Sequence, residues 1–379
     1  MDCPEFLKPR LRLFLSADIV GSTALKQSRG NSSAEELKDR SHWFSIIQGF
    51  YIEARRSFLG GWEDLSEQRT LQPELFGEAP DLWKTIGDEV LFVKVLSDHR
   101  QLAITLKCWI AAVHHLKAFV KARDPRLDIK ATAWTAGFPV KNKEVVISSS
   151  SSLSSENNDN YFIESGRLLD AFYADGPDAS KIEVDYIGPS IDIGFRISSQ
   201  STTRKFVIGV DVAYILALTN PRQDDLIDEF SVRYEGAIPL KGVFGGVSYP
   251  IFWLDLSIPG GISHLEDRLT GAVAASRDDV RRFCDAFYKE YVNYTHRPFI
   301  KADTEQHISD IPSWYSEIHE NMIANYVAET EEAGEPEEPV ADQPQMGEGE
   351  IKEAARQIVD ELAKPSLDDE GKSLEEPEA

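Results

Sequence analysis

The sequence predicts an α/β fold in which helices pack on a mixed β-sheet, and three observations support this. Strand-like apolar runs alternate with stretches whose apolar residues recur every three or four positions, the spacing of an amphipathic helix. Residues 82–95 contain two short β-rich stretches separated by Gly87-Asp88, which is typical of a β-hairpin. The chain has 379 residues, 42% of them hydrophobic, which suffices for one large domain with an appendage or for two domains.

The first 139 residues predict three strand regions separated by helices. Residues 11–18 form an apolar run typical of a buried strand. Ser33 and Glu36 have the spacing of a capping box, and they predict a helix that ends at Gly60-Gly61. The remaining expected elements are a loop insertion over 62–80, the hairpin over 82–95, a helix from Asp98 to about 123, and a strand over 127–139.

The next part of the chain continues the alternation of strands and helices. Residues 148–160 are rich in Ser and Asn, which predicts a mobile surface loop. After this loop the sequence predicts helices over 166–173, 189–198 and 212–218, and strands over 181–188, 205–209 and 240–256.

The C-terminal part differs in composition from the rest. Residues 256–327 show a helical pattern and predict a helical extension of the domain that covers 11–255. Residues 329–379 contain 18 acidic and 4 basic side chains, so they carry −14 of the net charge of −24. We expect residues 328–379 to form an acidic and largely disordered tail, with a short helical island at 351–362.

Composition also excludes several classes of protein. Residues 1–328 still carry a net charge of −10, which argues against nucleic-acid binding through a basic face. No apolar run approaches the roughly 18 to 20 residues of a membrane span, and the N-terminus lacks a signal pattern. The three cysteines are scattered without metal or disulfide spacing. We therefore expect a cytoplasmic protein that binds neither membranes nor nucleic acid.

Two acidic turns are the main candidates for a functional site. Asp18 stands where the first strand-like run ends, and Asp88 occupies the hairpin turn. Alone, each would more often be a cap or an ordinary turn residue. Together they can supply carboxylates from rigid strands, which is what a pair of Mg²⁺ or Mn²⁺ ions over a triphosphate requires.

The sequence around these two turns resembles the motifs of the class III nucleotidyl cyclases. The resemblance covers about residues 11–255 and is carried by LSADIVGST around Asp18 and KTIGD around Asp88. It implies a ferredoxin-like α/β domain that works as a head-to-tail homodimer, with each active site shared between two subunits. It also implies that Asp18, Asp88 and the Ile19 carbonyl bind two Mn²⁺ or Mg²⁺ ions per active site.

The same resemblance assigns roles to four further residues. Lys84 and Asp185 match the pair that contacts the base, and Arg196 matches the arginine that stabilises the transition state. Asp192 stands where the family usually has Asn, so the resemblance implies a ribose contact made by a carboxylate, which accepts but cannot donate a hydrogen bond when ionised.

A narrower resemblance, to the bacterial pyrimidine cyclases of Pycsar anti-phage systems, adds the segments TAWTAGFPV and GPSIDIGFRI. It implies a cyclase that converts UTP, or less favourably CTP, into a cyclic mononucleotide sensed by an effector protein. The choice of base stays open: Lys84 with Asp185 is the adenine pattern of the wider family, whereas bulky rings near the base would favour a pyrimidine. The candidate rings also suit a hydrophobic core; they are Phe14, Trp43, Tyr51, Trp83 and Trp134.

Two other functions remain compatible with the sequence. One is an adenylate cyclase that makes cyclic AMP. The other is a catalytically silent, cyclase-like module that senses a nucleotide, although the presence of Asp18, Asp88 and Arg196 disfavours it.

Overall fold

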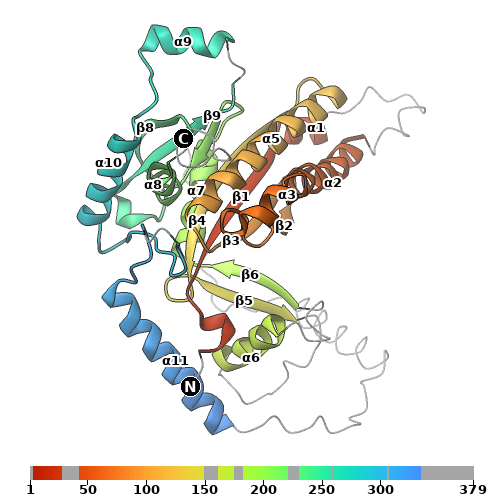
Figure 1. Cartoon of the computed structure of the whole chain (residues 1–379). Helices are drawn as coiled ribbons and strands as arrows, with labels where there is room; N and C mark the ends of the chain where they lie inside the picture. The colour runs from red at the N-terminus through yellow and green to blue at the C-terminus, as the bar shows by residue number, and fades with distance from the viewer. Residues whose placement is uncertain are drawn as a thin grey trace, which may run out of the picture. The chain divides into compact units, whose positions relative to one another are not determined.

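The fold is a seven-stranded mixed sheet with helices packed against it, as seen in a computed structural model (Figure 1). This confirms the predicted α/β class. The structure describes residues 3–27, 42–148, 161–174, 182–220, 230–257, 260–304 and 307–333. The predicted capping box, most of the Ser-rich loop and the tail beyond residue 333 lie outside these ranges.

The central strands come from the predicted strand and hairpin regions. Strand β1 (Arg10–Val20) lies between β3 (Glu89–Leu96) and β4 (Asp128–Phe138), antiparallel to both. Strand β2 (Asp81–Ile86) forms the hairpin with β3 and lies at one edge of the sheet. The hairpin turn is therefore next to the C-terminal end of β1.

The other half of the sheet contains the one parallel pair among the described strands. Strand β7 (Lys205–Ile208) runs parallel to β4, and β9 (Ser248–Asp255) is antiparallel to β7. The outer strand β8 (Val232–Pro239) was not expected from the sequence. Strands β5 (Lys143–Ser148) and β6 (Ile182–Ile187) form a separate two-stranded antiparallel sheet, of which only β6 was expected.

One face of the main sheet is covered by long helices. Helix α5 (Arg100–Arg123) packs on β4 and β1, α2 (His42–Glu63) packs on α5, and α8 (Val210–Leu218) packs beside α5 (Figure 1). Among the described helices, α5 alone is long and apolar enough to cross a membrane, but its apolar residues lie in this core. The helix is thus accounted for by packing on the sheet.

Two expectations about the α2 region were wrong. Helix α2 continues through Gly60 and Gly61 to Glu63, and neither glycine adopts the positive φ with which a glycine commonly ends a helix. The expected loop over 62–80 contains two short helices, α3 (Ser66–Leu71) and α4 (Pro73–Phe76), and α4 buries Leu75 and Phe76 in the core.

The opposite face of the sheet carries α7 (Pro189–Ile197), which packs on β4. A short helix, α1 (Ser22–Gln27), follows β1 directly. Helix α6 (Tyr161–Tyr173) packs against β5 and the N-terminal segment.

The expected helical extension contains α9 (Ile262–Thr270), α10 (Arg277–Glu290) and α11 (Ser313–Ala333). Helix α10 packs on α8, and its Val280 and Phe287 belong to the main hydrophobic core. The described residues up to Glu329 form one compact unit. The extension therefore shares its core with the domain that precedes it.

Candidate active site

The structure brings the two predicted metal ligands, Asp18 and Asp88, to the same end of the sheet. Asp18 lies near the end of β1, beside Glu89 of β3 and Lys130 of β4. Asp88 lies in the β2–β3 turn, and the Ile19 amide donates a hydrogen bond to its carbonyl oxygen over 3.3 Å. The Ile19 side chain is buried in the core, so only its backbone is available to a ligand.

The two carboxyl groups influence each other electrostatically. Burial raises the pKa of Asp18, and the negative charge of Asp88 adds to this effect. Burial also acts to raise the pKa of Asp88, but hydrogen bonds from Ser22 and Lys26 outweigh it and leave that pKa lowered. A pair of carboxylates that repel each other is a favourable place for a divalent cation, because the cation removes the repulsion.

Two lysines that sequence reasoning missed face these carboxylates. Lys130 Nζ lies 3.0 Å from Asp18 Oδ2, and Lys26 Nζ lies 3.0 Å from Asp88 Oδ1. The four side chains are each about one quarter to one third exposed, so the site is open to solvent. Oxygen ligands in this setting suit Mg²⁺ or Mn²⁺, and cations bound there would release both lysines to face an anionic substrate.

A second group of possible metal ligands lies elsewhere, at the start of α5. Asp98, His99 and Asp303 are buried, and their ligating atoms are all within 4.8 Å of one another. Their oxygens are already hydrogen-bonded, however: Asp98 accepts from Arg100 over 2.9 Å, and Asp303 accepts from His99 over 2.8 Å and from the His307 amide over 2.9 Å. These hydrogen bonds explain the group as a contact that joins the start of α5 to Asp303 and His307.

The predicted base-contacting residues, Lys84 of β2 and Asp185 of β6, form an ion pair. Lys84 Nζ lies 2.7 Å from Asp185 Oδ1. The same oxygen accepts hydrogen bonds from Trp83 Nε1 over 3.1 Å and from the Tyr186 amide over 2.9 Å. Both paired side chains are 32% exposed, so the pair can be reached from solvent.

Aromatic rings lie beneath this pair. Phe14 is 0% exposed and makes an edge contact with Trp83 and a stacked contact with Trp134, at centroid distances of 5.2 and 5.5 Å. Phe14 therefore has no surface for a base in this structure, and it contacts the rings of Trp83 and Tyr186, the chain neighbours of Lys84 and Asp185. Trp43 lies on α2, and the Tyr51 hydroxyl donates a hydrogen bond to the Gly87 carbonyl in the hairpin turn.

The predicted catalytic residues, Asp192 and Arg196, lie one turn apart on α7 and are both exposed. Within the described residues, neither side chain forms an ion pair. No ion pair in this part of the chain therefore connects Asp192 or Arg196 to Asp18 or Asp88. The opposite side of α7 faces the sheet, where Gly194 packs directly on the Trp134 ring. Close packing at Gly194 thus sets how α7 presents Arg196 to solvent.

We predict that Gly194→Ala displaces α7. A Cβ atom at this position would lie 2.2 Å from Trp134 ring atoms, which have no room to retreat in the core. We expect a loss of about 1–3 kcal/mol in the free energy of unfolding, measured by urea denaturation. Gly60→Ala in α2 is the matched control, because nothing lies within 4 Å there and the change should gain up to about 1 kcal/mol. Equal stability of the two variants would contradict this packing.

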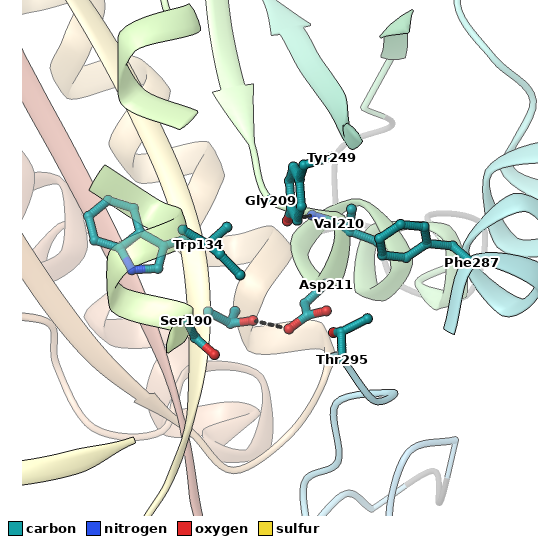
Figure 2. A pocket seen from close by; sticks show the side chains of 10 residues that line it. Trp134, Ser190, Gly209, Val210, Asp211, Tyr249, Phe287 and Thr295 are labelled. Atoms are coloured by element: carbon teal, nitrogen blue, oxygen red, sulfur yellow. Dashed lines mark hydrogen bonds between the residues drawn. The ribbon is translucent and has the colours of Figure 1, made fainter. Parts of the chain in front are cut away.

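A small cavity lies behind α7 (Figure 2). Ser190, Asp211 and Thr295 line it, and Thr135 Oγ1 donates to Asp211 Oδ2 over 3.3 Å. Burial raises the pKa of Asp211 to about 6. The space of about 30 Å³ holds one or two water molecules and excludes a nucleotide. This cavity is therefore too small to be the substrate site.

No family model matches the chain, and no curated protein matches its sequence. Similar solved structures include the adenylyl cyclase CyaB from P. aeruginosa, which is 13% identical with a TM-score of 0.38 over 66% of this chain and 97% of CyaB. Another is the guanylate cyclase domain of RhGC from Catenaria anguillulae in complex with GTP, 11% identical with a TM-score of 0.38 over 65% of this chain and 97% of that domain. Resemblances at this level do not carry function.

Proposed function

We propose that this protein is a nucleotidyl cyclase, which converts a nucleoside triphosphate into a 3′,5′-cyclic monophosphate and pyrophosphate. The observation that carries the proposal is the meeting of Asp18 and Asp88 at one end of the sheet, flanked by Lys26 and Lys130. Two carboxylates with two adjacent ammonium groups suit an anionic triphosphate with its cations.

The reaction is an internal phosphoryl transfer. The ribose 3′-oxygen forms a bond to the α-phosphorus, the bond to the β-phosphate oxygen breaks, and the 3′-hydroxyl proton is lost to solvent. Two Mn²⁺ or Mg²⁺ ions held by Asp18, Asp88 and the Ile19 carbonyl would activate that hydroxyl and neutralise charge on the leaving group.

The remaining residues act on the substrate directly. Lys26 and Lys130, once released from the carboxylates, would contact the triphosphate. Arg196, from a second subunit, would meet the charge that builds on the α-phosphate, a task for which its fixed fork and permanent charge are suited. Asp192 would accept a hydrogen bond from the ribose. The enzyme would therefore work as a homodimer.

For the base we propose a pyrimidine, with UTP preferred slightly over CTP. Three donors occupy Asp185 Oδ1, and Oδ2 has no partner among the described residues, so Oδ2 is available to uracil N3–H or to the cytosine amine. Lys84 would donate to a uracil oxygen. Trp83 stands beside the pair, fixed by Phe14 and Tyr186 at centroid distances of 5.2 Å each, and its bulk favours a smaller base.

We extend this proposal to biological role. Four sequence segments resemble those of Pycsar cyclases, and this resemblance supports a second messenger made in the cytoplasm during phage infection and sensed by an effector protein. An adenylate cyclase is the second candidate, because a pair such as Lys84–Asp185 can equally bind adenine. The carboxylate would accept a hydrogen bond from the adenine amine, and the lysine would donate one to a ring nitrogen.

The test is to incubate the purified protein with each of the four radiolabelled nucleoside triphosphates and Mn²⁺, and to identify the products by chromatography. We expect cyclic UMP as the main product, with less cyclic CMP. Cyclic AMP as the sole product would overturn the pyrimidine assignment. Nucleotide binding without pyrophosphate release would instead indicate a sensor.

A further inference from the structure

A buried charge network links the main sheet to the small β5–β6 sheet. Arg12 of β1 donates to Glu144 of β5 through Nε over 2.9 Å and through Nη2 over 2.7 Å. Tyr173 of α6 donates to Glu144 Oε2 over 2.6 Å and accepts from Arg12 Nη2 over 2.7 Å. The Arg12 and Glu144 side chains are only 8% and 3% exposed.

Such a network is a costly way to gain stability, because desolvating two charges offsets most of their attraction. It does impose a fixed geometry, since the guanidinium fork accepts few arrangements of its partners. The network is therefore better explained by what it holds in place than by the free energy that it contributes.

The network holds β6, the strand that carries Asp185, in place. Glu144 lies opposite Tyr186 in the β5–β6 ladder, and Val145 lies opposite Asp185. The Arg12 guanidinium lies 5.2 Å from the centroid of the Tyr186 ring. Arg12 is thus in contact with both strands of the small sheet at the level of Asp185.

Side chains help to set this position, together with the short turn over residues 139–142 that joins β4 to β5. Among the described strands, no backbone ladder joins the β5–β6 sheet to the seven-stranded sheet. Yet the base-contacting pair bridges the two sheets, because Lys84 is on β2 and Asp185 is on β6. The distance between Lys84 and Asp185 therefore depends on how the small sheet is anchored.

We propose that Arg12, Glu144 and Tyr173 are positioning residues that fix Asp185 against Lys84 and thereby control base binding. This rests on the proposed function, in which the Lys84–Asp185 pair contacts the base. The network touches neither the metal ligands nor Arg196, so it governs the affinity for the nucleotide and leaves the chemical step unchanged.

Helix α11 supports the same arrangement from outside. The Tyr326 hydroxyl donates to Asp170 of α6 over 2.9 Å, and the Tyr326 ring packs directly on Gly166 of α6. Tyr173 is the last residue of that helix. The position of the Tyr173 hydroxyl is therefore tied to the C-terminal extension.

The test is Tyr173→Phe in the full-length protein, which removes one hydroxyl and keeps the ring. Tyr288→Phe is the matched control, because its hydroxyl also donates to a buried carboxylate, that of Asp211 on α8, over 2.6 Å. Two readouts are needed: kcat and KM for the preferred triphosphate, and the ¹⁹F spectrum of protein labelled with 5-fluorotryptophan. The Trp83 signal, assigned with Trp83→Phe, reports on the indole bond to Asp185.

We expect Tyr173→Phe to raise KM by about ten-fold, the effect of one lost hydrogen bond to a charged group, with kcat unchanged within about two-fold. The Trp83 signal should shift in Tyr173→Phe and stay in place in Tyr288→Phe. An unchanged Trp83 signal, or a shifted signal with an unchanged KM, would overturn the proposal. If the wild type cyclises no nucleotide, the proposed function fails; the ¹⁹F shift still decides whether the network positions Asp185.

Discussion

Replacing Asp18 or Asp88 with asparagine should lower the rate of cyclisation by about 10³-fold or more, because each change removes a charged ligand from a site that needs both. The fold should survive. Each carboxylate is partly exposed and paired with one lysine, so its removal should change the free energy of unfolding by about 1 kcal/mol at most. Product formation, Mn²⁺ binding by calorimetry and thermal unfolding measure these effects separately.

The matched control for this experiment is Asp81→Asn, the same chemical change on the same hairpin but at the start of β2. It should retain activity and Mn²⁺ affinity. Substantial turnover in either Asp18→Asn or Asp88→Asn would exclude the two-metal arrangement.

The affinity for Mn²⁺ should also depend on pH in a particular direction. Burial and the charge of Asp88 raise the pKa of Asp18, so a proton competes with the metal there at higher pH than at an ordinary aspartate. Affinity should therefore fall as the pH drops through that raised pKa and should recover on return to neutral pH. Binding that is constant down to the usual aspartate range would show that Asp18 is not a ligand.

The sequence predicted those parts of the fold whose signals are local. Gly87-Asp88 indicates a hairpin whatever its surroundings, and β1 and α5 have long apolar patterns that only a strand or a helix can satisfy. Strand β8 has no such pattern, because it is an edge strand with several exposed residues and an irregular register between Tyr234 and Gly236. Its pairing with β9 could not be inferred from composition.

The site, like the fold, was predictable only where a local sequence signal marks the residue. Asp18 and Asp88 are marked by the turns in which they stand. Lys130 is not, because it is an ordinary strand lysine until the register of β1 with β4 places it beside Asp18. Phe14 shows the reverse case: it was one of the rings that could lie near the base, and its burial follows from Trp83 and Trp134, which cover it.

Arg196→Ala should lower kcat by about 10³-fold, the smaller end of the range for an arginine that stabilises phosphoryl transfer. Arg196 is exposed on α7 and forms no ion pair within the described residues, so its loss leaves no buried charge unpaired and should not affect folding. Thermal unfolding should therefore match that of the wild type, while product formation is lost.

Mixing two inactive variants tests whether the active site is shared between subunits. Equal amounts of Arg196→Ala and Asp88→Asn, exchanged by mild denaturation and refolding, should recover about a quarter of wild-type activity, because half of the dimers then contain one intact site of two. The control is a mixture of Asp18→Asn with Asp88→Asn. It should stay inactive, since both changes affect the metal-binding half of every site. Failure of the first mixture, with dimer exchange verified by mass spectrometry, would place Arg196 and Asp88 in the same half-site and refute the shared site.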